Sequence, residues 1–291
     1  MNAECVVDIR AECGETPVWD EREQLLWWID CPAAAIYRYR PDRGRNEQAK
    51  VEIDSPHVGS IALAEDGGML VLSGTGLWRH KPDGTRTRLA TVDTDRPENI
   101  PNDGKCDPQG RFWFGTMHRD SAKETGRLYR YDTARGLVAM DEGFSCSNGM
   151  GWSPDGGTMY FVDMMPGRIL AYDFNGCDGS ISNRRLFAQV DPAEGAPDGL
   201  AVDDVGGVWA AHWDGWCLSR FAPDGKRTAK IPVPVERPTC PTFGGKDMRD
   251  VYVTSAAMQL DAGRLAKGPL AGSLFRLRSD VAGPKAVRFK P

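Results

Sequence analysis

A pattern of roughly 45 residues recurs along the chain, and a recurrence at this period limits the fold to an array of similar units. Each copy opens with a polar turn, usually containing glycine, that leads into an apolar strand. The six copies are WDEREQLLWWID (19–30), AEDGGMLVLS (64–73), DPQGRFWFGT (107–116), SPDGGTMYFVD (153–163), DDVGGVWAAH (203–212) and GGKDMRDVYVT (244–254). A later strand also recurs, from IYRYRPD (36–42) in the first copy to LFRLRSD (274–280) in the last.

Six units of this length, each a four-stranded meander, are typical of a six-bladed β-propeller. The apolar runs are short and separated by Gly, Pro and Asp, and no long helical period is present. A β-sandwich or a closed barrel does not require such a period. We therefore predict an all-β fold in which residues 1–291 form one propeller domain. The strand left over before the first unit, about residues 4–10, is expected to complete the last blade and close the ring.

The composition, with 41% hydrophobic and 26% charged residues, is that of a globular protein. A formal net charge of −5 and the lack of a clustered Lys/Arg run argue against a nucleic-acid partner. No stretch is apolar and long enough to span a membrane, and residues 1–17 lack the apolar centre of a signal peptide. We expect a cytoplasmic protein, a monomer or small homo-oligomer, with 8 reduced cysteines and no CxxC pair.

The register of the repeat shows which residues surround the axis of the ring. In a propeller blade the first strand is innermost and starts at one mouth of the central channel. Counting back from each inner turn locates the residue that opens this strand. Asp198 lies five residues before the turn residue Asp203, and Asn102 lies five residues before Asp107. The six equivalent positions are Glu15, Gly59, Asn102, Asn148, Asp198 and Cys240.

Four of these six positions carry side-chain oxygens where a packed strand prefers apolar residues. Asp and Asn also open strands for purely local hydrogen-bonding reasons, but four of six at one register favour a shared ligand. Carboxylates and amides that converge on a partly buried point are costly unless a cation lies between them. We therefore predict a central site for one divalent metal ion. The oxygen donors suit Ca²⁺, Mg²⁺ or Mn²⁺, with Zn²⁺ and Fe²⁺ left open.

The same geometry assigns the loops to two faces. The connections between second and third strands are expected on the face that carries the site, at residues 115–126, 163–167, 212–216 and 256–272. The PDG sequences at 82–84 and 223–225 are expected to be structural turns on the far face. The PDG at 197–199 has the same composition, but the register makes it the opening of a strand.

The segments CGETPVWDE (13–21), NDGKCDPQGRFWFGTM (102–117), SNGMGWSPDG (147–156), PDGLAVDDVGGVW (197–209) and FGG (243–245) occur in this order. As a set they resemble the gluconolactonase, senescence-marker-protein (regucalcin) and luciferin-regenerating-enzyme family, over nearly the whole chain. The resemblance implies a six-bladed propeller that binds one divalent metal and opens sugar lactones to aldonic acids. It assigns the metal ligands to Glu15, Asn148 and Asp198. It assigns a substrate contact to Asn102, with Asp103 beside it.

A mechanism follows for such a site. The metal is expected to polarise the lactone carbonyl while Asp198 acts as the general base and Asn102 orients the sugar. The chain departs from the family pattern at Ile100, because many relatives carry Arg two residues before the substrate Asn. His118, expected on the loop after GTM, is a candidate replacement, and a solvated loop residue is the other interpretation of it.

The leading prediction is a metal-dependent lactonase acting on a pentono- or hexono-lactone. A propeller that hydrolyses esters or organophosphates is a second enzyme hypothesis. A non-catalytic propeller that binds a divalent metal is the third. The residues do not identify the metal or the sugar.

Overall fold

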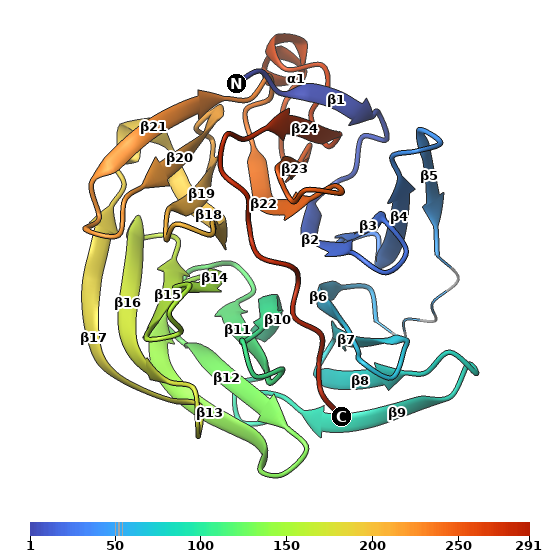
Figure 1. Ribbon diagram of the computed structural model, residues 1–291, viewed down its shortest axis with the longest axis vertical. Coiled ribbons are helices and arrows are strands. Elements are labelled where there is room, and N and C mark those ends of the chain that lie inside the picture. The colour runs from blue at the N-terminus through green and yellow to red at the C-terminus, as the bar shows by residue number, and fades with distance from the viewer. Residues whose placement is uncertain (50, 52, 54) are drawn as a thin grey trace.

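Six four-stranded antiparallel sheets surround one axis in the computed structural model, which describes every residue except 50, 52 and 54 (Figure 1). Blade 1 holds β2 (Gly14–Asp20), β3 (Leu25–Asp30), β4 (Ala35–Arg40) and β5 (Arg45–Gln48). Blade 2 holds β6 (Val58–Leu63), β7 (Met69–Ser73), β8 (Gly76–His80) and β9 (Arg86–Thr91). Blade 3 holds β10 (Asn99–Cys106), β11 (Phe112–His118), β12 (Gly126–Asp132) and β13 (Gly136–Phe144).

The remaining blades follow the same order. Blade 4 holds β14 (Ser147–Trp152), β15 (Thr158–Asp163), β16 (Arg168–Asn175) and β17 (Ser180–Gln189). Blade 5 holds β18 (Ala196–Val202), β19 (Val208–Trp213), β20 (Cys217–Phe221) and β21 (Arg227–Pro232). Blade 6 holds β22 (Pro238–Gly244), β23 (Asp250–Ser255) and β24 (Leu274–Arg278), with the α-helix α1 (Ala262–Lys267) between its last two strands. The six-bladed all-β prediction is confirmed.

The N-terminal strand β1 (Glu4–Val7) closes the ring. It pairs antiparallel with β24 as the outermost strand of blade 6, with Cys5 opposite Phe275. Of residues 4–10, which the sequence assigned to a closing strand, residues 4–7 form β1. Among the described residues, no helix is long and apolar enough to cross a bilayer.

Buried aspartates in the inner turns anchor the indole rings of the next strand. The indole Nε1 of Trp113 donates to Asp107 Oδ2 at 2.9 Å, and Trp209 Nε1 donates to Asp203 Oδ2 at the same distance. Both tryptophans are fully buried. This repeated contact shows that blades 3 and 5 share one register, which is the basis on which the site positions were aligned.

The last residues of the chain, 279–291, form a C-terminal strap that crosses the centre of the ring (Figure 1). Its carbonyl at Ala282 accepts from the N–H of Asp204 in blade 5 at 2.9 Å. Its N–H at Phe289 donates to Leu63 of blade 2 at 2.8 Å, and its N–H at Lys290 donates to Gly110 of blade 3 at 3.0 Å. The strap therefore ties together blades that are far apart in sequence.

We expect Arg288→Met to lower the free energy of unfolding by about 3 kcal/mol, because it breaks a buried ion pair and leaves a carboxylate without its cation. The Arg288 guanidinium in the strap pairs with Asp20 of blade 1, and both side chains are buried. Arg278→Met is the matched control, since its pair with Asp247 is about half exposed and should contribute less than about 1 kcal/mol. Urea denaturation of both variants measures the difference. Equal losses would show that the strap ion pair contributes no more than a surface pair.

Candidate metal and substrate site

Each innermost strand is interrupted at, or directly after, the residue that the sequence register selected. The pairing between first and second strands shifts between Glu15 and Val18 in blade 1 and between Ser147 and Met150 in blade 4. The corresponding shifts lie at 58–60, 101–104, 197–200 and 238–241. A bulge redirects a side chain and ends regular pairing. The bulges include Gly59, Asn102, Asn148, Asp198 and Cys240, whereas Glu15 still pairs with Ile29 and directly precedes the bulge of its strand.

At three of the bulges the side chain is fixed by the next backbone N–H. Thr16 N–H donates to Glu15 Oε2 at 3.0 Å. Gly104 N–H donates to Asp103 Oδ1 at 2.7 Å, and Gly149 N–H donates to Asn148 Oδ1 at 3.1 Å. Each of these bonds engages one oxygen and orients the side chain before any ligand binds.

Glycine after the oxygen donor allows neighbouring innermost strands to approach closely. A Cβ on Gly149 would lie 2.4 Å from the backbone N of Leu200, and a Cβ on Gly199 would lie 2.4 Å from Cβ of Cys240. Neither contact is possible for a side chain without moving a strand. The Asn-Gly and Asp-Gly pairs of blades 4 and 5 therefore reflect the narrowness of the channel.

Thr16 occupies an unusual backbone conformation directly beside Glu15. Its φ is 44°, in the left-handed region that is costly for a β-branched residue, and its side chain is buried. Its Oγ1 donates to Gly59 O on the innermost strand of the neighbouring blade at 3.4 Å. Such an outlier persists only where the surroundings hold it, and these outliers cluster at functional sites.

Three buried carboxylates of this region, those of Glu15, Asp103 and Asp198, influence one another electrostatically. Burial raises the pKa of Glu15, and the negative charges of Asp198 and Asp103 raise it further. Burial is also the main reason that the pKa of Asp198 and that of Asp103 are raised. The ammonium of Lys105 opposes the shifts at Glu15 and Asp103. The side chains of all three acids are almost completely shielded from solvent, with exposures of 7% for Glu15, 3% for Asp103 and 2% for Asp198.

The charge balance of this region fits a divalent cation. With the three acids ionised and Lys105 protonated, the buried formal charge is −2, which one divalent ion neutralises. The Asn148 amide lowers the pKa of Asp198, so these two side chains are near each other. Among the described residues, no three or more His, Cys, Asp or Glu side chains are grouped to hold a metal. The predicted ligands are two carboxylates and one amide, a set that leaves further coordination positions to water or substrate oxygens.

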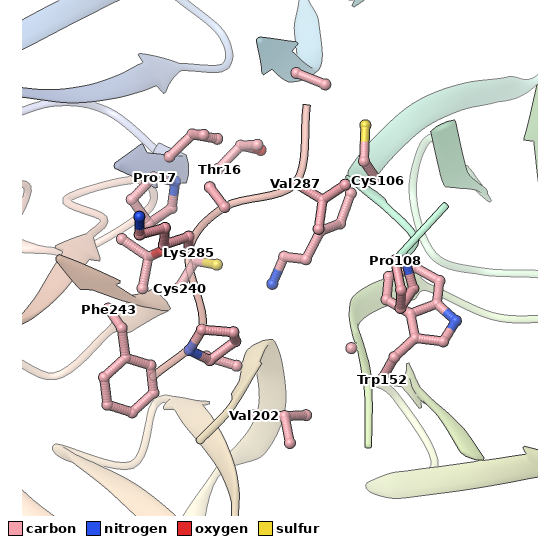
Figure 2. A pocket seen from close by; sticks show the side chains of 18 of the residues that line it. Thr16, Pro17, Cys106, Pro108, Trp152, Val202, Cys240, Phe243, Lys285 and Val287 are labelled. Atoms are coloured by element: carbon pink, nitrogen blue, oxygen red, sulfur yellow. The ribbon is translucent and has the colours of Figure 1, made fainter. Parts of the chain in front are cut away.

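A cavity of about 330 Å³ lies in the channel between the bulges and the strap. Figure 2 shows its walls, which include Thr16, Cys240 and Trp152, and its strap side, which includes Lys285 and Val287. Asp103 also lines it, and its Oδ2 is buried without a hydrogen-bond partner among the described residues. Lys105, another lining residue, donates from Nζ to Leu200 O at 2.7 Å. The cavity therefore approaches the carboxylates from the strap side.

Comparison with known proteins places the chain in a family. The model of the SMP-30/Gluconolactonase/LRE-like region matches residues 13–257. The chain belongs to this family. Bovine regucalcin is 35% identical, and the match covers 95% of this chain and 94% of that protein. Pentonolactonase XacC of Haloferax volcanii is 33% identical over 100% of this chain and 98% of its own length.

Solved structures agree with the family assignment. A calcium-binding protein, regucalcin, from Agrobacterium tumefaciens has a TM-score of 0.92 and 27% identity, covering 99% of this chain and 97% of its own. A luciferin-regenerating enzyme has a TM-score of 0.91 and 27% identity, with 99% of each chain covered. The predicted family is thus confirmed by both sequence and fold.

Within the SMP-30/gluconolactonase/LRE-like fold, the predicted substrate residues lie on blade 3. Asn102 is half-buried, and its Nδ2 donates to Ser147 O at 2.8 Å, which leaves Oδ1 as an acceptor. Ile100 is also half-buried and lies opposite Met117 on the neighbouring strand. The structure therefore places an apolar side chain at the position where the family pattern often has Arg.

The predicted loop position of His118 is wrong. Strand β11 continues through His118, so the loop spans 119–125 instead of 115–126. The imidazole is buried, and its Nδ1 accepts from the N–H of Asp120 at 3.3 Å. Because His118 pairs with Asn99, β11 includes residues 115–118, which the sequence analysis had assigned to the loop. Its role toward substrate stays a prediction.

Two basic residues of this region were not among the predicted site residues. Lys105 follows Asp103 by two positions and provides the positive charge described above. His57, before β6, donates from Nε2 to Pro101 O at 3.0 Å, and burial lowers its pKa. A lysine within an innermost strand is a sequence signal that could have been used. His57 lies in a connection with no motif, so only the three-dimensional structure brings it to blade 3.

Proposed function

We propose that the protein is a metal-dependent sugar lactonase that opens a pentono- or hexono-lactone to the aldonic acid. The observation that supports this proposal is that Glu15 and Asp198 are both buried and that the negative charge of Asp198 raises the pKa of Glu15, while the Asn148 amide lowers that of Asp198. Membership of the family supports it, as do relatives named pentonolactonase and regucalcin. Calcium is the candidate ion that the description of the Agrobacterium structure favours.

Glu15, Asn148 and Asp198 would hold the ion through side-chain oxygens. An ion bound there supplies positive charge for the oxygen that becomes negative when a lactone carbonyl is attacked. The surrounding chain contributes rigidity, because Glu15 and Asn148 are already oriented by backbone N–H groups. A preorganised donor set of this kind needs little rearrangement during the reaction.

Asp198 is the proposed general base. Its side chain is buried, and the nearby Asn148 amide lowers its pKa, opposing the effect of burial. In this role it takes the proton from the attacking water and returns it to the ring oxygen as the C–O bond of the lactone breaks, which regenerates the carboxylate and releases the hydroxy acid. Asn102 Oδ1 is free to accept a sugar hydroxyl because only the Nδ2 group is engaged by Ser147.

The substrate preference follows from the groups around Asn102. Ile100 and Met117 present apolar side chains where a guanidinium would donate hydrogen bonds. We infer that the preferred lactone places a C–H face or a missing hydroxyl against Ile100. A lactone hydroxyl placed against Ile100 would find no hydrogen-bond partner, and this would weaken binding.

The function is tested by a pH-drop assay over a panel of aldonolactones, using chelator-stripped protein with each divalent metal added back. We expect acid release from at least one pentono- or hexono-lactone that depends on added metal. Faster turnover of aryl esters or organophosphates than of every sugar lactone would favour the ester hydrolase. Metal binding without hydrolysis of any substrate would favour the non-catalytic propeller.

Glu15→Gln is expected to weaken metal binding at least about tenfold, because a neutral amide replaces one of two ligand carboxylates. Isothermal titration calorimetry on chelator-stripped protein measures the affinity. Glu12→Gln is the matched control, since Glu12 is an exposed acid three residues earlier in the chain. An unchanged affinity in Glu15→Gln would remove Glu15 from the ligand set.

A further inference from the structure

Three sulfur atoms meet at the edge of the candidate site. Cys146 Sγ lies 3.4 Å from Met117 Sδ and 3.7 Å from Met164 Sδ. Cys146 and Met164 are 4% and 8% exposed, and Met117 is half-buried. We call Met117, Cys146 and Met164 the sulfur cluster.

The backbone fixes this cluster from three directions. Met117 lies in β11 opposite Ile100, and on its other side it forms an isolated antiparallel bridge with Cys146, the residue just before β14. Met164 follows β15, and its N–H donates to Cys146 O at 3.0 Å. The three residues therefore come from two blades, and main-chain contacts hold them together independently of their side chains.

We propose that Met117, Cys146 and Met164 form a binding site for Cu(I). One thiolate and two thioethers are soft donors, which select Cu(I) over the oxygen-preferring ions expected at Glu15, Asn148 and Asp198. Two sulfurs that each lie about 2.3 Å from one metal ion are at most about 4.6 Å apart, so both observed separations allow a shared ion. On binding, the thiol proton passes to the buffer, and copper keeps its oxidation state.

The position of the cluster couples it to the candidate metal centre. Met164 Sδ lies 3.6 Å from Asn148 Nδ2. An ion held by Met164 draws that sulfur away from the Asn148 amide and adds positive charge beside it. If the proposed lactonase function is correct, Cu(I) should therefore inhibit the enzyme.

Binding is tested by titrating the full-length protein with Cu(I) under argon, in the presence of ascorbate and a colorimetric Cu(I) chelator. The wild type is expected to take up one equivalent that Cys146→Ser and Met164→Leu bind at least tenfold more weakly. Leu keeps the volume of Met and removes only the sulfur. Equal uptake by the wild type and both variants would overturn the proposal, as would a wild type that cannot compete with the chelator.

Matched controls separate this site from the other thiols. Met159→Leu changes a fully buried methionine of the same blade, and Cys217→Ser changes a buried cysteine of blade 5. Both should bind Cu(I) like the wild type, and weakened binding in either would contradict the assignment. Cys13 and Cys31 are two further buried free cysteines that lie near each other. Both stay present in every variant, so copper bound by them cannot account for a loss in Met164→Leu.

The titration needs no catalytic activity, so its result is independent of the proposed function. Where lactone hydrolysis is observed, one equivalent of Cu(I) should inhibit the wild type at least fivefold more than Met164→Leu. Equal inhibition of both would contradict the coupling through Met164, whether or not the ion binds.

Discussion

Asp198→Asn is expected to abolish lactone hydrolysis, lowering kcat at least about a thousandfold while the fold is retained. The substitution keeps the shape of the side chain and removes both a ligand charge and the proposed proton acceptor. Because Asp198 lies fully buried among like charges, the amide should not destabilise the metal-free protein. The decisive measurement is kcat on the best lactone of the panel, together with circular dichroism of the variant.

A matched control lies six residues further along the chain. Asp204→Asn makes the same chemical change at an exposed turn after β18, and it should leave kcat within about twofold. If Asp198→Asn kept a tenth or more of wild-type activity, Asp198 could not be the general base. The acceptor would then have to be another group of the channel, and Asp103, with its unpartnered Oδ2, would be the next residue to change.

Removing the metal is expected to make the stability of the protein fall as pH rises. The pKa values of Glu15, Asp103 and Asp198 are raised in the folded protein, chiefly by burial. The folded chain therefore binds more protons than the unfolded chain from about pH 4, the ordinary carboxyl pKa, up to the raised values. The contribution of these groups is fully present below about pH 4 and is lost as pH rises through the raised pKa values.

Metal binding should reverse this loss. An ion present at a hundred times its dissociation constant stabilises the folded state by about 2.7 kcal/mol, which corresponds to a rise of several degrees in Tm. Thermal melts of chelator-stripped protein from pH 4 to pH 8, with and without added metal, measure both effects. The Asp198→Asn variant lacks one buried acid and keeps all surface carboxylates. Its Tm should therefore depend less on pH than that of the stripped wild type. A stripped protein that is most stable near pH 8 would contradict the proposed burial of three ionised acids.

The fold could be predicted because both the turn-and-strand pattern and the spacing of individual residues repeat along the sequence. Polar turns and apolar strands recur six times, and the offset from Asn102 to Asp107 matches that from Asp198 to Asp203. The same equivalence is seen in the structure as a hydrogen bond, because Asp107 and Asp203 each accept the indole N–H of an equivalent tryptophan. A periodic sequence thus identifies residues that share a place in the ring, even when they are a hundred positions apart.

What the sequence could not predict depends on single contacts outside the repeat. The extent of β11 is one example, because the pairing of Asn99 with His118 has no counterpart in the period. The meeting of Cys146 with Met164 is another, since it arises from one backbone hydrogen bond in a connection between strands. The C-terminal strap is a third, because it belongs to none of the six units. Local interactions of this kind require coordinates.

The sequence predicted the position of Asp103 only in part. From the sequence, a role in substrate binding was expected for Asp103 only because of the family resemblance. The structure adds that its carboxylate faces a cavity and shares a buried region with two other acids. Register alone selects Asn102, and the bulge that spans both residues brings Asp103 into the channel as well.

The strap also bears on how the molecule can be made. Both ends of the chain are needed to finish the ring, because β1 lies against β24 and residues 279–291 reach back to blades 1, 2 and 3. Contacts of such long sequence separation form late in folding. During synthesis the first blades must therefore form without these contacts until residues 279–291 have left the ribosome. Truncation at the C-terminus should consequently reduce soluble yield more than an equal truncation within an exposed turn.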